Sequence, residues 1–147
     1  MEQAPFKIIN CKPYSTIALA LAGVILVGIG LYFIFLRPSL LPEDLRYMGS
    51  MLENVKQNMP RLSNWLQKVF WVMGGYIFTT GLMTIFIAVT SFRSRLPGAF
   101  GIVAITGISS IGLMTVVNFI IKSDFKWVLL IFTLPWLIAL ILYTYKK

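Results

Sequence analysis

The stretch PYSTIALALAGVILVGIGLYFIFL, residues 13–36, decides the fold of this chain. It contains no charged side chain between Lys12 and Arg37. A helix rises about 1.5 Å per residue, so a helix over this stretch is about 36 Å long and crosses a hydrocarbon core of about 30 Å. A cleavable signal peptide has a shorter apolar centre. We therefore predict a retained transmembrane helix over about residues 14–36.

Three further apolar runs follow the first. They cover about residues 69–92, 97–121 and 127–145, and Pro135 lies in the middle of the last run. A proline inside a transmembrane helix usually kinks it, because neighbouring groups can satisfy the freed carbonyl. The sequence thus predicts an all-α polytopic membrane protein, in which residues 1–147 form one bundle domain with four transmembrane helices.

The segment between the first two runs predicts an amphipathic helix over about residues 42–59. Pro42 suits a first helical turn, and the acidic Glu43 and Asp44 suit the positive end of a helix dipole. Gly49 disfavours the helix by about 1 kcal/mol relative to alanine. Apolar residues recur at alternating spacings of three and four, which is typical of one buried helix face; they are Leu45, Met48, Leu52, Val55 and Met59.

The composition favours a membrane protein over a soluble or nucleic-acid-binding one. Hydrophobic residues make up 58% of the chain and the mean hydropathy is +0.82, whereas soluble domains are about 45–50% apolar. The net charge is +8, from 13 Lys and Arg against 5 Asp and Glu. These basic residues lie between the apolar runs, where lipid headgroups and orientation signals account for them. We expect the lipid bilayer as a partner and no nucleic acid.

The chain offers few groups that could perform chemistry. Histidine is absent, which removes the commonest general base and metal ligand. Cys11 is the single cysteine, so no intrachain disulfide is possible. There is no phosphate-binding glycine loop and no nucleophile elbow. We therefore expect no catalytic residue, no cofactor and no metal site.

Basic residues near the membrane ends predict the orientation. Four transmembrane helices place both termini on one side, and that side also holds the short loop after the second run. Arg93 and Arg95 lie in that loop, and Lys146 and Lys147 follow the last run. Because short basic segments are retained on the cytoplasmic side, we expect both termini in the cytoplasm.

The four predicted helices contain no Asp, Glu, Lys or Arg. Proton-coupled carriers need an ionisable group at membrane depth, so this activity is disfavoured. The polar residues that remain are mild, and Thr79, Thr80 and Asn118 are the candidates for a polar lining or for contacts between helices. Hydroxyl and amide groups in such helices usually bond to their own backbone or to a neighbouring helix.

Small residues form a regular stripe along the third run. Such stripes let helix backbones approach closely, which is how membrane bundles pack without a hydrophobic driving force. We expect this stripe to pack against another helix, either within the chain, in a homo-oligomer or in another membrane protein. Its members are Gly98, Gly101, Ala104, Gly107 and Ser110.

One segment carries a resemblance to known proteins. The stretch LPEDLRYMG, residues 41–49, is followed by Pro60, by the paired Gly74 and Gly75 and by Gly81. It resembles an uncharacterised group of small bacterial four-helix membrane proteins that have an LPxDLxxxG segment after the first helix, and the architecture is similar to that of DoxX-type proteins. The resemblance implies a bacterial inner membrane.

The same group often has a His-Asp-Arg triplet before the paired glycines. Here Phe70, Trp71 and Val72 occupy that region. Any chemistry that depends on the triplet is therefore not expected in this chain.

Three functional hypotheses remain open. The first is a non-enzymatic accessory, scaffolding or interaction subunit that packs against itself or another membrane protein. The second is a carrier or pore for a small neutral or lipid-like molecule. The third is a membrane-surface enzyme that uses the linker carboxylates Glu43, Asp44 or Glu53 as acid and base.

Overall fold

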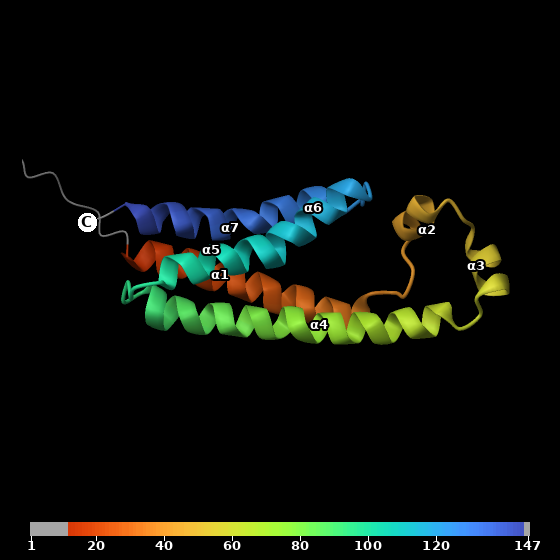
Figure 1. Ribbon diagram of the computed structural model, residues 1–147, viewed down its shortest axis with the longest axis horizontal. Coiled ribbons are helices and arrows are strands. Elements are labelled where there is room, and N and C mark those ends of the chain that lie inside the picture. Colours follow the sequence, from red (N-terminus) through yellow and green to blue (C-terminus); the bar gives the residue numbers. More distant parts are fainter. Residues whose placement is uncertain (1–11, 146–147) are drawn as a thin grey trace, which may run out of the picture.

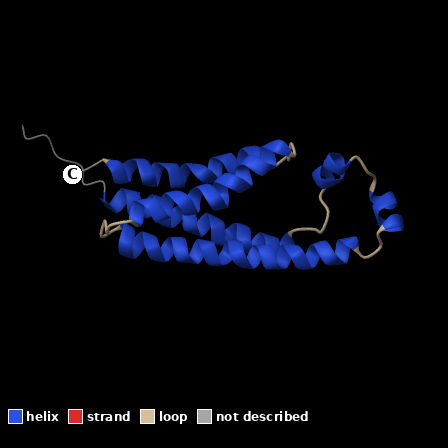
Figure 2. Ribbon diagram, viewed as in Figure 1, coloured by secondary structure: helices blue, strands red, loops and turns tan. Residues whose placement is uncertain are grey.

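The computed structural model describes residues 12–145. Cys11, Lys146 and Lys147, on which some of the predictions rest, lie outside these residues. The described part is helical and contains no strand (Figures 1 and 2). The all-α prediction is confirmed. The elements are α1 (Lys12–Leu31), η1 (Tyr32–Leu36), α2 (Pro42–Met48), α3 (Leu52–Asn58), α4 (Leu62–Ile87), η2 (Ala88–Phe92), α5 (Ala99–Gly107), η3 (Ile108–Gly112), α6 (Leu113–Ile120) and α7 (Lys126–Thr144).

Four continuous helical stretches are long and apolar enough to cross a membrane. They are Pro13–Leu36, Leu62–Phe92, Ala99–Ile120 and Lys126–Thr144, which we call the first to fourth spans. Their length and composition are those of a multi-pass membrane protein. The second span has 31 residues and is therefore about 46 Å long, well beyond a core of about 30 Å. Figure 1 shows the start of α4 running past the end of α1 towards α3.

The first span lies at the centre of the bundle. It packs along α4 on one side and along α7 on the other, and the third span packs mainly on α7. Residues from all four spans meet in the core, including the buried Leu26 of α1, Phe92 of η2, Val103 of α5 and Trp136 of α7. The order of packing is therefore second, first, fourth and third span.

Glycines seven residues apart bring α1 and α4 into backbone contact. A Cβ atom added to Gly30 would lie 2.6 Å from the backbone nitrogen of Phe78, and one added to Gly81 would lie 2.6 Å from that of Val27. Added Cβ atoms at Gly23 and Gly74 would meet Gly81 and Gly30 backbone oxygens at 2.9 and 2.8 Å. No side chain fits at these four positions, so the two helices pack antiparallel at closer range than ordinary side chains allow.

The predicted linker helix over 42–59 is wrong as one helix, because the structure divides it at Gly49. Gly49 has φ +64° in the left-handed region, and its N–H donates to the Arg46 carbonyl. The N–H of Ser50 donates to the Leu45 carbonyl at 3.2 Å. This pair of bonds is the Schellman ending of a helix, for which glycine is the favoured residue. The chain then turns and starts again as α3.

The third span is interrupted by one π-helical turn, η3, between α5 and α6. The Ser109 hydroxyl donates to the Ile105 carbonyl at 2.8 Å, and the Ser110 hydroxyl donates to the Thr106 carbonyl at 2.6 Å. Serine hydroxyls that bond back to the preceding turn often bend or widen a helix, and π turns are frequent where a helix must redirect its side chains. By contrast, α7 continues through Pro135 without a break.

Candidate functional site

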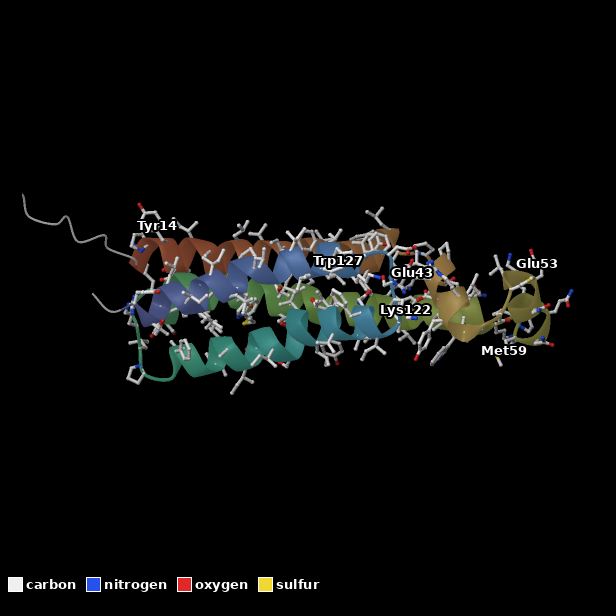
Figure 3. All side chains as sticks on the ribbon, turned by 90° about the horizontal axis from the view of Figure 1, so that it is seen from above. Tyr14, Glu43, Glu53, Met59, Lys122 and Trp127 are labelled. Atoms are coloured by element: carbon white, nitrogen blue, oxygen red, sulfur yellow. The ribbon has the colours of Figure 1, made fainter. Side chains whose placement is uncertain are left out.

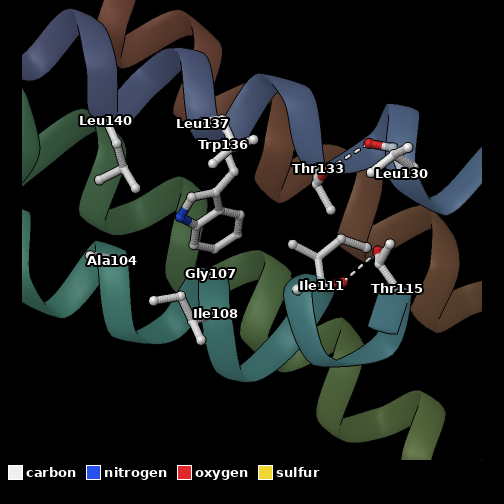
Figure 4. Close-up of a pocket in the computed structure, with 11 residues that line it drawn as sticks. Ala104, Gly107, Ile108, Ile111, Thr115, Leu130, Thr133, Trp136, Leu137 and Leu140 are labelled. Carbon is white, nitrogen blue, oxygen red and sulfur yellow. Dashed lines mark hydrogen bonds between the residues drawn. The ribbon is translucent and has the colours of Figure 1, made fainter. Parts of the chain in front are cut away.

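A cleft of about 250 Å³ opens between the third span and α7 (Figure 4). Its walls come from both helices and meet at the π turn η3. The lining is almost entirely apolar, and it contains no charged side chain. The lining residues are Ala104, Gly107, Ile108, Ile111, Gly112, Thr115, Leu130, Thr133, Trp136, Leu137 and Leu140.

Trp136 and Gly107 build the middle of the cleft. The indole lies directly over Gly107, where an added Cβ atom would overlap the ring. Its Nε1–H donates to the Val103 carbonyl at 2.9 Å, and the side chain is 3% exposed. A buried indole N–H needs such a partner, because leaving it unpaired in an apolar interior is costly. Gly107 therefore makes the space and Val103 supplies the acceptor that together fix this tryptophan.

Two threonines lie at the same end of the cleft, one on each wall (Figure 4). Thr133 of α7 donates its hydroxyl to the Leu130 carbonyl at 2.6 Å. Thr115 of α6 donates its hydroxyl to the Ile111 carbonyl at 2.8 Å. Both residues are more than nine-tenths buried. Both hydroxyls are therefore bonded within their own helices, and the surface of this end of the cleft is almost entirely apolar.

The three polar residues predicted from sequence lie elsewhere. Thr80 donates to the Tyr76 carbonyl at 2.8 Å, and the Asn118 amide donates to the Met114 carbonyl at 2.9 Å. Thr79 is exposed on α4. Thr79 and Thr80 belong to the second span and Asn118 to the third, and none of them lines the cleft. The structure therefore does not bring these residues together into one site.

The predicted small-residue stripe has two different environments. Ala104 lines the cleft, Gly107 faces Trp136, and Ser110 bonds to its own helix. Gly98 precedes α5 with φ +84° in the left-handed region, and Gly101 is exposed with open space where a Cβ would be. Only the inner part of the stripe is used within the chain, and packing of Gly101 against a second protein stays a prediction.

Sequence reasoning did not single out Trp136 and Thr133. A tryptophan in the middle of an apolar run is a usable signal, because membrane tryptophans gather at the interfaces. Trp136 is ten residues from Lys126, the first residue of α7, and so about 15 Å deep along the helix. No sequence pattern shows that Gly107 is the residue it meets, since the two are brought together only by the packing of the spans.

At one end of the bundle, α2 docks on the loop between α6 and α7. Glu43 is 5% exposed and accepts a hydrogen bond from the Ser123 hydroxyl at 2.9 Å. The Ser123 oxygen in turn accepts the Phe125 backbone N–H at 3.1 Å. Arg46 also forms an exposed ion pair with Asp124 at 2.9 Å. Figure 3 shows Glu43 beside the end of the bundle that carries Lys122 and Trp127.

A second polar contact fastens the start of α2 to the first two spans. Arg37 pairs with Asp44 at 3.2 Å, and the same carboxylate oxygen accepts the Leu41 N–H at 2.9 Å. The Arg37 guanidinium lies 3.5 Å from the centre of the Phe70 ring. A cation so placed over an aromatic face is attracted by the ring quadrupole. We call this set of contacts, together with those of Glu43 and Arg46, the polar cap.

The three carboxylates of the linker have different surroundings. Glu43 and Asp44 each have a bonded partner, and Glu53 is exposed on α3, away from both (Figure 3). Over residues 12–145, no group of three His, Cys, Asp or Glu side chains could hold a metal ion. The arrangement positions α2 over the bundle end and does not assemble an acid–base pair.

In comparisons with known proteins, no family model, no curated protein and no solved structure matches this chain. The resemblance to the bacterial four-helix group therefore stays a prediction.

Proposed function

We propose that the chain is an accessory or scaffolding subunit that packs in the membrane against a second copy or another membrane protein. The observation that carries this proposal is the exposed surface around Gly101. Gly101 has no neighbour within 4 Å of an added Cβ. Its neighbours three residues away on either side, Gly98 and Ala104, are both small, and the exposed Ile105 lies four residues after it. A surface of small residues is what a second helix needs for close approach.

Gly28 of the first span provides a comparison inside the same molecule. It is also exposed and also has open space for a Cβ. Large exposed side chains flank it, with Val24 four residues before and Leu31 three residues after. Another backbone cannot approach such a position closely, so Gly28 serves as a matched control for Gly101.

The test is the assembly state of Gly101→Leu against Gly28→Leu in mild detergent, measured by native mass spectrometry. Both substitutions place the new side chain in open space, so we expect both variants to fold. If the surface around Gly101 is the interface, Gly101→Leu abolishes the oligomer or the complex with the partner, and Gly28→Leu retains it. Retention of the same assembly by both variants would contradict the proposed surface.

A carrier for a small neutral or lipid-like molecule is the second candidate, and the cleft beside α7 favours it. A polar pathway has less support, because Thr80, Thr84 and Asn118 each donate a hydrogen bond to a carbonyl of their own helix. The enzyme hypothesis has least support, since the carboxylates of Glu43 and Asp44 form the hydrogen bonds and the ion pair of the polar cap. We do not propose it.

We further propose that the chain lies in a bacterial inner membrane with both termini in the cytoplasm. A membrane-impermeant maleimide applied to intact cells tests this orientation. Cys11 should stay unlabelled, whereas a Glu53→Cys substitution on the exposed α3 of a Cys11→Ser chain should react. Labelling of Cys11 in the native chain, without labelling of the Glu53→Cys variant, would place both termini outside the cytoplasm.

A further inference from the structure

The loop between α6 and α7, together with the first residue of α7, carries two lysines that no acid neutralises. In the part of the chain that the structure describes, neither Lys122 nor Lys126 forms an ion pair. Asp124 is the acid between them, and its carboxylate pairs with Arg46 of α2 at 2.9 Å. Ser123 is fully buried, and its hydroxyl also donates to α2. The docking of α2 therefore occupies the other polar side chains of the loop and leaves the two lysines unpaired.

Lys122 occupies a backbone position at which glycine is favoured. Its φ is +54°, in the left-handed region. Its N–H donates to the Phe119 carbonyl, and the Ser123 N–H donates to the Asn118 carbonyl, which is the same Schellman ending as that at Gly49. A side chain in this conformation crowds the carbonyl group that follows it. The lysine therefore destabilises the turn relative to glycine, and the turn itself does not account for its presence.

A second basic residue, Arg95, occupies the equivalent position at the end of the second span. Its φ is +52°, and the turn has the same two backbone hydrogen bonds. Among residues 12–145, Arg95 and Lys122 are the two non-glycine residues with positive φ. The linker helix α2 lies outside the spans and ends with Gly49 instead. Cations thus replace glycine only where the helix crosses the membrane. Arg95 donates to the Tyr143 carbonyl, whereas Lys122 has no such partner.

Lys126 also opposes a local preference. It is the first residue of α7, at the positive end of the helix dipole, and the first turn contains no acid. A cation is unfavourable at this end. The neighbouring Trp127 is 60% exposed and packs edge-on against Phe119, with ring centroids 5.2 Å apart. Exposed tryptophans gather at the membrane interface, and Figure 3 shows Trp127 and Lys122 at the same end of the bundle. The two lysines therefore lie on the loop side of an interfacial aromatic pair.

We propose that this loop binds the phosphate of an anionic phospholipid through Lys122 and Lys126, with the acyl chains lying against Phe119 and Trp127. The charges select the headgroup. Phosphatidylcholine brings an ammonium group that the lysines repel, whereas the glycerol of phosphatidylglycerol leaves the phosphate charge uncompensated. Each unpaired cation near the membrane surface strengthens the binding of anionic lipid by about five-fold. The site goes beyond the accessory role and is independent of the protein that packs against the third span.

The experiment measures which phospholipid stays bound to the full chain. The protein is purified in mild detergent with equal amounts of phosphatidylglycerol and phosphatidylcholine that have the same acyl chains. Native mass spectrometry then gives the ratio of the two lipids in the first bound position. We expect the native chain to prefer phosphatidylglycerol. The Lys122→Gln and Lys126→Gln substitutions should each reduce this preference by about five-fold, and the double variant should show both losses.

Lys122→Gly separates the charge from the fold. Glycine adopts positive φ without strain, so the unfolding temperature of this variant should be no lower than that of the native chain. Its preference for phosphatidylglycerol should still fall by about five-fold. Lys56→Gln is the matched control, because Lys56 is an exposed lysine of α3 on the same side of the membrane but outside the loop. It should leave the preference unchanged.

Other outcomes overturn the proposal. Equal retention of the two lipids by the native chain, or an unchanged preference in the double variant, would mean that the lysines do not select a headgroup. A Lys122→Gly variant that unfolds at a lower temperature and keeps its preference would show that the lysine serves the turn. Displacement of the lipid by inorganic phosphate, but not by chloride at equal ionic strength, would mean that the loop binds free phosphate. If the double variant fails to fold, the native chain and Lys122→Gly still decide.

Discussion

The interface between α1 and α4 and the interface between the third span and α7 are both built on glycine, yet they reach opposite results. Between α1 and α4, Gly23 and Gly30 meet Gly81 and Gly74, and backbone lies against backbone. Against α7, Gly107 meets the large indole of Trp136, and a cleft remains beside it. A glycine in a helix leaves room for a neighbouring helix. The residue that faces the glycine determines whether the two backbones come into contact or a cleft remains between them.

The largest effect is expected from breaking the closed interface with Gly81→Leu. Its new side chain meets the backbone of Val27 and Gly23, which cannot move without separating the helices. Overpacking of this kind costs about 3 kcal/mol of unfolding free energy. Steric trapping or thermal unfolding in detergent measures the loss, with Gly75→Leu as the control because Gly75 has open space. Equal destabilisation by the two would remove the distinction between them.

Filling the open interface with Gly107→Leu should cost less. The indole of Trp136 must shift, but the cleft beside it offers room for a side chain to enter. We expect a loss of about 2 kcal/mol of unfolding free energy, within the usual range for overpacking. Thermal unfolding measured alongside Gly81→Leu ranks the two interfaces. A greater loss for Gly107→Leu would show that the open interface is the more rigid one.

Ser123→Ala tests whether the polar cap supports the open pair of helices at their loop. The substitution leaves Glu43 and the Phe125 N–H without their shared partner. Removal of a buried hydrogen-bond partner costs about 1 kcal/mol at least. Hydrogen exchange should show faster exchange in α2 and in the loop 121–125, with α1 and α4 unchanged. Ser50→Ala, which removes only an exposed hydroxyl contact to the neighbouring Met51 carbonyl, should change neither region.

Trp136→Phe should give the smallest effect and sharpen the comparison most. Phenylalanine keeps an aromatic ring over Gly107, and it removes the bond to Val103 and part of the buried ring volume. Hydrogen bonds between membrane helices average about 0.6 kcal/mol in double-mutant cycles. A loss of that size in thermal unfolding would show that shape fixes the ring. A loss of several kcal/mol would show that the bond and the full volume of the indole are both needed.

The spans could be predicted from sequence because hydropathy and length act locally. The four apolar runs correspond to the first to fourth spans, and the extension of α4 towards residue 62 reflects the amphipathic turns before the apolar run. The sequence analysis recognised that Gly49 disfavours a helix but did not predict that the helix ends there. The sequence around a glycine does not show whether the helix continues through it or ends at it. The Schellman bonds of Gly49 and Ser50 decide it in favour of two helices.

The candidate site could be predicted only in part. Gly107 was recognised as a packing residue, but its partner Trp136 lies in another span, and their meeting depends on the order in which helices pack. Thr79, Thr80 and Asn118 attracted attention by polarity alone, whereas hydrogen bonding to the local backbone accounts for Thr80 and Asn118. Polarity in the sequence therefore marks donors and acceptors without showing which remain free.

The unequal helix lengths have a consequence for the membrane that the protein occupies. The fourth span has 19 residues, about 28 Å of helix, whereas the second is long enough to span any natural bilayer. The shorter helix therefore sets the hydrophobic thickness that the protein tolerates. A bilayer thicker than about 30 Å would draw Lys126 into hydrocarbon or thin around α7 at a cost for each ångström of mismatch. This mismatch cost favours bilayers no thicker than the fourth span, and in such a bilayer the second span is long enough to extend into the water.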